Sequence, residues 1–176
     1  MTVLTDLSEW EGLETDLEAI LTDVLSSILG EEVLPAWEPA PPGEQALTRL
    51  AIHDLRGDGY VEIEILVPMA LAKVVAARML GVAQPLDDDI VDAVAELGNI
   101  AGGNVKSVLF EHSRLSLPLP RFELSGGETD RHPEGLVARA AVNGLVAELA
   151  VYPVAAALGL QWPPHPETDS DMESAQ

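Results

Sequence analysis

The chain has 176 residues, of which 30 are Asp or Glu and 9 are Lys or Arg; its formal net charge is −21 at pH 7, and it has no cysteine. This length favours a single domain with a sizeable core, and the missing cysteines exclude a disulfide framework and a zinc–thiolate site. The negative charge argues against nucleic acid and anionic membrane surfaces as partners, because both would repel the protein at long range.

The N-terminal sequence and the hydropathy pattern indicate a protein of the cytoplasm. The first residues, M-T-V-L-T-D-L-S-E-W-E, lack the basic region of a secretory signal. No apolar run approaches the about 18 residues that a membrane-spanning helix needs. We therefore expect a soluble, cytoplasmic protein.

The first stretch predicts a helix followed by a proline-rich connection. Apolar residues recur at helical spacing through Thr5–Leu29, which predicts a helix from about Leu13. Gly30 is suited to end it, because glycine adopts the left-handed cap conformation. Residues 35–43 (P-A-W-E-P-A-P-P-G) contain too many prolines for a helix or a central strand. We expect Trp37 to hold this connection against the body of the protein.

A hairpin and a second helix follow. Ala46–His53 and Gly59–Val67 predict two strands, and in the second one apolar residues alternate with glutamates, as in a half-buried strand. The R-G-D-G sequence of residues 56–59 indicates the turn between them. Apolar spacing then predicts a helix over Met69–Leu80, which Gly81 ends.

The stretch Asp89–Phe110 predicts a helix of about six turns. Its core side carries eight apolar residues: Ile90, Val91, Val94, Leu97, Ala101, Val105, Val108 and Leu109. Its opposite side carries six others: Asp89, Asp92, Glu96, Asn99, Gly103 and Lys106. Glu96 and Asn99 are three positions apart, so their side chains are neighbours on the outer surface of the helix.

Glycines at positions 98, 102 and 103 and an acidic start distinguish this helix. Each glycine destabilises a helix by about 1 kcal/mol relative to alanine. Gly98 falls on the core side, which favours close packing against a neighbour. Gly103 falls on the outer side, where it leaves room for a partner, permits a kink or has no role. Asp87–Asp89 favour capping and the helix dipole, with a metal site as the less common alternative.

The last third of the chain predicts strands and a tail. Leu115–Leu124 reads as a strand interrupted by two prolines, which places it at an edge or a bulge. Leu136–Val142 and Leu145–Tyr152 flank Asn143-Gly144, the strongest short signal for a β-hairpin. Residues 161–176 have low hydrophobicity and are expected to be disordered.

These elements predict a single α+β domain over residues 1–160, in which long helices cover a mostly antiparallel sheet. The common catalytic signatures are missing: the sequence has no Walker, dinucleotide-binding or G-x-S-x-G motif. No histidine has a second ligand at the right spacing on a clear helix. The Glu96/Asn99 pair is therefore the remaining candidate site, and a solvated helix face is the alternative interpretation.

The sequence around this pair resembles a known family. E-L-G-N-I-A-G-G-N, Glu96–Asn104, is similar to the E-x-x-N signature of the CheC/CheX/FliY family of chemotaxis phosphatases. The order of elements over Leu13–Tyr152 resembles the CheX branch, which has one such site. Gly98 lies within the signature, and the proline-rich connection and the acidic tail look like additions to the family pattern.

The resemblance implies a CheX-like fold and dephosphorylation of a CheY-like receiver domain of a response regulator. Glu96 would pair with a receiver lysine, and Asn99 would enter the receiver's active site and orient the attacking water. Asp92, Gly103 and Lys106 would contact the partner, with Gly103 giving clearance. The receiver would supply the phosphoaspartate and the Mg²⁺, so this chain is expected to bind no cofactor and no metal.

Two further expectations concern partners. A non-catalytic, CheX-like adaptor that binds a receiver or another signalling protein is the alternative function, because a fold alone does not establish catalysis. CheX-like proteins pair by extending their sheets. The strand Leu145–Tyr152 has few charges that would protect an edge, so we expect a homodimer through this strand.

Overall fold

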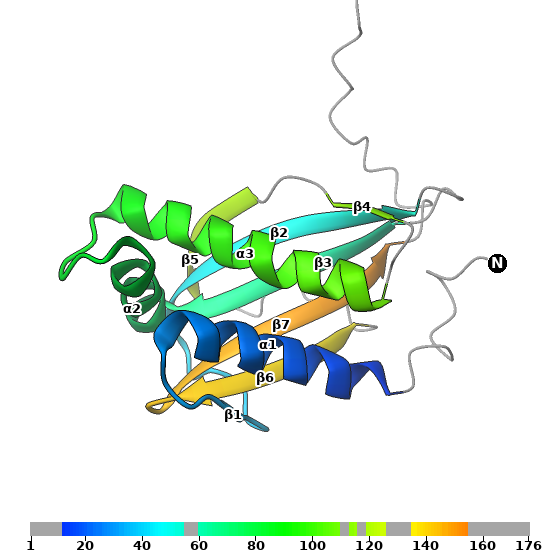
Figure 1. Cartoon of the computed structure of the whole chain (residues 1–176), viewed down its shortest axis with the longest axis horizontal. Coiled ribbons are helices and arrows are strands. Elements are labelled where there is room, and N and C mark those ends of the chain that lie inside the picture. Colours follow the sequence, from blue (N-terminus) through cyan, green and yellow to red (C-terminus); the bar gives the residue numbers. More distant parts are fainter. Residues whose placement is uncertain (1–11, 55–59, 110–112, 116–118, 126–134, 155–176) are drawn as a thin grey trace, which may run out of the picture.

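The structure is a computed structural model that describes residues 12–54, 60–109, 113–115, 119–125 and 135–154. Within these residues, three helices lie against a seven-stranded sheet (Figure 1). The elements in chain order are α1 (Leu13–Leu29), β1 (Leu34–Pro35), β2 (Gly43–Asp54), β3 (Tyr60–Pro68), α2 (Met69–Leu80), α3 (Asp87–Leu109), β4 (Ser113–Leu115), β5 (Leu119–Ser125), β6 (Leu136–Val142) and β7 (Leu145–Val154). The predicted α+β class is confirmed.

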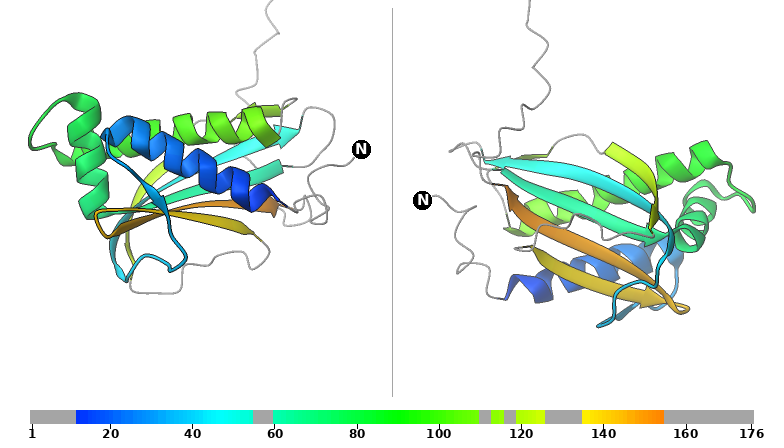
Figure 2. Two further views of the ribbon diagram at one scale, coloured as in Figure 1. Left: turned by 60° about the horizontal axis from the view of Figure 1, so that its bottom comes forward. Right: turned by 180° about the vertical axis from the view of Figure 1, so that it is seen from behind.

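The molecule has two layers. Helices α1 and α3 lie side by side across one face of the sheet, and α2 packs against them at one end (Figures 1 and 2). Both α1 and α2 end where the sequence predicts, since Gly30 and Gly81 adopt left-handed conformations with φ of 67° and 68°. None of the helices in the described residues has the length and apolar character needed to cross a bilayer.

The strand order is β1-β6-β7-β3-β2-β4, with β5 also paired to β2, and every pairing is antiparallel. Both predicted hairpins are present. Strands β2 and β3 pair with Ala46 opposite Val67, and residues 56–59 between them lie outside the described residues. Strands β6 and β7 join through Asn143 and Gly144, whose φ angles of 51° and 79° are those that a tight hairpin turn requires.

The edge predicted for dimer formation is wrong. Strand β7 pairs with β6 on one side and with β3 on the other, where Leu149 lies opposite Ile65. Residues 148–151 therefore have a partner strand on both sides, and β7 is an inner strand of the sheet. The hairpin signal identifies one neighbour of a strand, but it carries no information about the strand that pairs on the other side.

Two further positions differ from the sequence expectations. Trp37 is 83% exposed and does not hold the connection after β1; instead Ala36 N donates to Arg139 O at 2.9 Å, and Ala40 N donates to Glu148 Oε1 at 3.3 Å. Val108 is 57% exposed, because nothing among the described residues covers its side of the last turn of α3.

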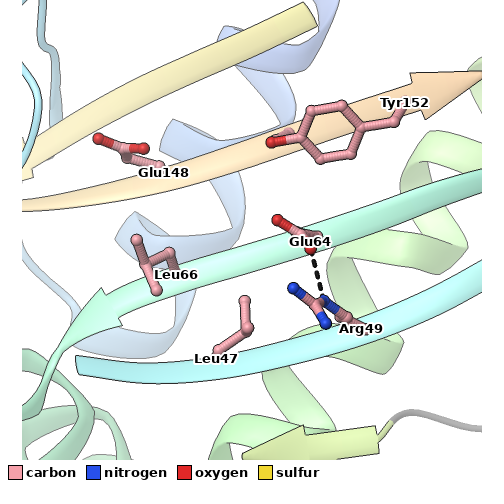
Figure 3. A pocket seen from close by; sticks show the side chains of 7 residues that line it. Leu47, Arg49, Glu64, Leu66, Glu148 and Tyr152 are labelled. Carbon is pink, nitrogen blue, oxygen red and sulfur yellow. Dashed lines mark hydrogen bonds and ion pairs between the residues drawn. The ribbon is translucent and has the colours of Figure 1, made fainter. Parts of the chain in front are cut away.

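The sheet has a different character on each face. The face under the helices is apolar, with side chains such as Ile63, Ile65 and Leu149 in one continuous core. The opposite face carries charged side chains that are paired across strands, including Arg49 on β2 with Glu64 on β3 (Figure 3). Several side chains of this second face are nearly buried, including Leu66, Glu148 and Tyr152.

Glu148 makes two of the hydrogen bonds on this second face of the sheet, the rear face, which is turned away from the helices. Its side chain is 3% exposed and accepts a hydrogen bond from Arg139 Nε at 3.2 Å. It also accepts the bond from Ala40, which places the proline-rich connection against the rear of β7. A carboxylate that is buried to this extent is retained only when it is paired and hydrogen-bonded.

Candidate functional site

Helix α3 begins with a side-chain cap. Asp89 Oδ2 accepts a hydrogen bond from Leu86 N at 2.8 Å, and Ile90 N donates to Leu86 O at 3.0 Å. The helix therefore starts at Asp87, two residues before the predicted start. The three aspartates of its first turn lie where the helix dipole favours negative charge. In the described part of the chain, no three His, Cys, Asp or Glu residues are grouped in a way that could hold a metal ion.

The inner side of α3 packs on the sheet. Five of its residues are almost fully buried: Ile90, Val94, Leu97, Ala101 and Val105. Gly98 is buried with them, and a Cβ at this position would lie 2.8 Å from Thr48 Cγ2 and 3.1 Å from Thr48 Oγ1. The predicted close packing of Gly98 is thus confirmed, and the neighbour is β2.

The outer side of α3 carries the residues expected to function. Asp92, Glu96 and Asn99 are exposed, and Gly103 and Lys106 are partly exposed. Asn99 Nδ2 donates a hydrogen bond to Glu96 Oε2 at 3.2 Å. A carboxylate and a carboxamide therefore lie in contact on a rigid helix, on the side turned away from the sheet.

Gly103 is the open position on this surface. A Cβ placed there would have nothing within 4 Å, so packing within the described part of the chain gives no reason for a glycine. The helix also runs unbroken through this position, from Asp87 to Leu109. Room for a partner, or no role at all, are the explanations that remain.

The charges of α1 and α3 are almost all negative. Helix α1 carries four carboxylates and α3 carries five: Glu14, Asp16, Glu18, Asp23, Asp87, Asp88, Asp89, Asp92 and Glu96. The one Lys or Arg on these two helices is Lys106.

The Glu96–Asn99 pair can accept and donate hydrogen bonds, but neither the carboxylate nor the carboxamide is a strong nucleophile. Such a pair can hold and orient other groups through hydrogen bonds.

Thr48 is a residue of this region that the sequence did not identify. It lies on β2 directly beneath Gly98, its side chain is fully buried, and its Oγ1 has no hydrogen-bond partner among the described residues. A buried hydroxyl without a partner is unfavourable. No sequence pattern could have indicated this residue, because the contact joins a strand and a helix that are distant in the chain.

Comparison with known proteins bears on both the sequence and the fold. The family described as "Chemotaxis phosphatase CheX" matches residues 49–134, a range that contains α3 with Glu96 and Asn99. No curated protein matches the chain in sequence.

Several solved structures share the fold. CheX from Vibrio vulnificus is 16% identical with a TM-score of 0.64, and the match covers 78% of this chain and 96% of that one. A CheX–CheY–BeF3–Mg²⁺ complex from Borrelia burgdorferi contains a chain that is 18% identical, with a TM-score of 0.59 and coverage of 80% and 97%. FliY from Thermotoga maritima is 17% identical, with a TM-score of 0.52 and coverage of 90% and 94%.

At these identities the structural matches establish a shared fold, and the family match adds the sequence pattern of the region that carries the site. The predicted resemblance, drawn from Glu96–Asn104 and the order of elements, agrees with both. The chain therefore has a CheX-like fold, and its residues 49–134 match the family of chemotaxis phosphatases described as CheX.

Proposed function

We propose that this chain hydrolyses the aspartyl phosphate of a CheY-like receiver domain and that Glu96 and Asn99 are the residues responsible. The observation that carries the proposal is their contact on the exposed side of α3, within the range that matches the family. The Borrelia burgdorferi relative, solved together with CheY, BeF3 and Mg²⁺, supports a receiver domain as the partner.

The proposed role of Asn99 is to orient water. A carboxamide offers both a donor and an acceptor, so it can hold a water molecule in line with the phosphorus without acting as a base. An acyl phosphate is already activated, and correct placement of the nucleophile is a large part of what catalysis requires. The phosphoaspartate and the Mg²⁺ belong to the receiver in this scheme, and Asn99 is inserted into a site that is otherwise complete.

The proposed role of Glu96 is to hold the docked geometry. In the free protein its carboxylate accepts a hydrogen bond from the Asn99 side-chain amide, and this bond limits the rotation of the carboxamide before docking. In the complex the same carboxylate would pair with a lysine of the receiver. Asp92 and Lys106 lie beside the pair on the outer side of α3 and would contact the partner, and Gly103 would give clearance.

An adaptor that binds a receiver without accelerating hydrolysis is the second candidate. Structural likeness is compatible with it, because binding and catalysis use the same surface. The presence of both a carboxylate and a carboxamide at the site favours the phosphatase, since docking alone needs no group that holds water.

The two roles predict different effects of substitution. Asn99→Ala should lower the rate of phosphate loss from a phosphorylated CheY-like receiver by about a hundredfold or more, and leave its dissociation constant nearly unchanged. Glu96→Ala should weaken binding by roughly ten- to hundredfold, and Glu96→Lys should weaken it further by placing like charges together. Phosphate release and binding to the beryllofluoride-activated receiver measure the two quantities separately.

Ser27→Ala is the matched control, because it removes an exposed hydroxyl from α1 and leaves the outer side of α3 unchanged. It should behave as the wild type in both assays. An Asn99→Ala protein that hydrolyses at the wild-type rate would show that the mechanism is wrong. A wild-type protein that binds the receiver without accelerating hydrolysis would establish the adaptor instead.

A further inference from the structure

Gly98 brings α3 unusually close to β2 at the level of the Glu96–Asn99 pair. A Cβ on Gly98 would lie 2.8 Å from Thr48 Cγ2, 3.1 Å from Thr48 Oγ1 and 3.3 Å from Leu50 Cδ1. Carbon atoms attract best at roughly 3.5–4.0 Å. The helix therefore lies closer to this strand than it could if any side chain were present at position 98.

The strand side of the contact has little freedom to move. Thr48 pairs with Ile65 of β3 on one side and with Pro120 of β5 on the other, so its backbone is held from both directions. Its side chain is branched at Cβ and is restricted in χ1, and it is fully buried. Leu50 differs, because the atom in contact is the end of a longer side chain that can rotate away.

Any side chain at position 98 must therefore displace the helix. Glu96 and Asn99 belong to the same turn of α3 as Gly98, so an outward shift there moves both of them. Asn99 is the direct neighbour of Gly98 in the chain, and its side chain is exposed to solvent.

We propose that the Gly98–Thr48 contact sets the height of α3 above β2 and thereby positions Asn99. Gly98 and Thr48 are positioning residues, since neither reaches the outer surface. The importance of this position for hydrolysis rests on the function proposed above. A misplacement of about 1 Å can cost on the order of a hundredfold in rate, so the contact is well placed to determine the activity without taking part in it.

Four proteins test this contact: the wild type, Gly98→Ala, Thr48→Ala and the double variant. Gly98→Ala should lower the rate of phosphate loss from a phosphorylated CheY-like receiver by roughly ten- to hundredfold, with a smaller loss of affinity because Glu96 moves as well. Thr48→Ala removes both Thr48 atoms that a Cβ at position 98 would meet. The double variant should therefore recover most of the lost rate.

A graded variant strengthens the test. Thr48→Ser removes the nearer atom, Cγ2, and keeps a hydroxyl, so Gly98→Ala combined with Thr48→Ser should recover part of the rate. A general loss of stability does not predict this order, because alanine is the better helix residue and Thr48→Ala opens a cavity. Ser27→Ala, on α1, serves again as the control that should change nothing.

The position of Asn99 can be read without any receiver. The side-chain amide signals of Asn99 in the NMR spectrum of the isolated protein should shift in Gly98→Ala and return toward the wild-type values in the double variant. Unchanged signals together with an unchanged rate in Gly98→Ala would overturn the proposal, as would a loss that Thr48→Ala does not restore. If the wild type fails to accelerate phosphate loss, the proposed function is wrong, and the Asn99 signals of the same four proteins still decide whether the contact positions this residue.

Discussion

At the scale of single residues, the inner and outer glycines of α3 differ in what surrounds them. Gly98 meets Thr48 and Leu50, whereas a Cβ on Gly103 would meet nothing within 4 Å. The same substitution, glycine to alanine, should therefore have opposite structural consequences one and a half turns apart. At Gly98 it forces the helix away from the sheet, and at Gly103 it only adds a methyl group to an open surface.

This difference leads to a prediction for Gly103. Gly103→Ala should raise the free energy of unfolding by about 1 kcal/mol, because alanine is the better residue inside a helix and no clash opposes it. If the glycine leaves room for a receiver domain, the same variant should bind the receiver more weakly. Chemical denaturation and binding to an activated receiver measure the two effects. A protein that is more stable and binds equally well would show that Gly103 has no role in docking.

The residues of the site divide into those that sequence reasoning could find and one that it could not. Glu96 and Asn99 follow from helical periodicity, because residues three apart share a side of a helix, and the structure places them in contact. Gly98 follows from the same periodicity as a packing position. Thr48 does not, because its place under Gly98 depends on how α3 crosses β2, and periodicity within one element says nothing about that crossing.

At the scale of elements, the helices and the two hairpins were predictable because their signals are local. The end of α1 at Gly30 and the turn at Asn143-Gly144 each depend on a few adjacent residues. The placement of β7 between β6 and β3 was not predictable. Strand neighbours depend on long-range pairing, and a mostly apolar strand fits the middle of a sheet as well as it fits an edge used for dimer formation.

The rear of the sheet gives a prediction about ion pairs. Arg139 bonds to Glu148, with side chains 24% and 3% exposed, whereas Arg78 bonds to Glu31, with side chains 54% and 38% exposed. Arg139→Met should lower the free energy of unfolding by about 1.5–3 kcal/mol, because the buried carboxylate of Glu148 then loses the charged hydrogen bond that Arg139 donates. Arg78→Met should cost less than about 1 kcal/mol.

Both variants keep an unbranched apolar stem of similar length, so the comparison isolates the charged group. Urea denaturation of the two variants beside the wild type gives the two differences. Equal changes in the free energy of unfolding would mean that the ion pair between Arg139 and Glu148 stabilises the fold no more than the exposed pair does, despite the burial of Glu148.

At the scale of the whole molecule, charge is distributed in a way that bears on association. The helical layer carries carboxylates from both α1 and α3, and Lys106 is the one Lys or Arg on either helix. A partner that docks on this layer is attracted over long distances if its own docking face is basic. Homodimer formation remains a prediction, and with β7 inside the sheet it would have to use a different edge.

The negative charge of α1 and α3 predicts a salt-dependent association with the receiver. The association rate constant should fall as salt rises, because the screening length shortens from about 30 Å at 0.01 M to about 10 Å at 0.1 M, while the dissociation rate constant should change little. Asp92→Asn should reduce this dependence more than Asp23→Asn, since Asp92 lies one turn from Glu96 on α3. Stopped-flow mixing at several salt concentrations measures it. A rate constant that rises with salt would mean that the docking faces repel each other.

The strand order also determines when the chain can fold as it is synthesised. Strand β3 receives its second partner, β7, only after both helices α2 and α3 and three further strands have been made. Until β7 is complete, the central strand has a bare edge, and pairings between distant segments form slowly. A nascent chain therefore exposes this edge of β3 while residues 69–154 are being made, which is the stage at which binding by a chaperone would protect it from aggregation.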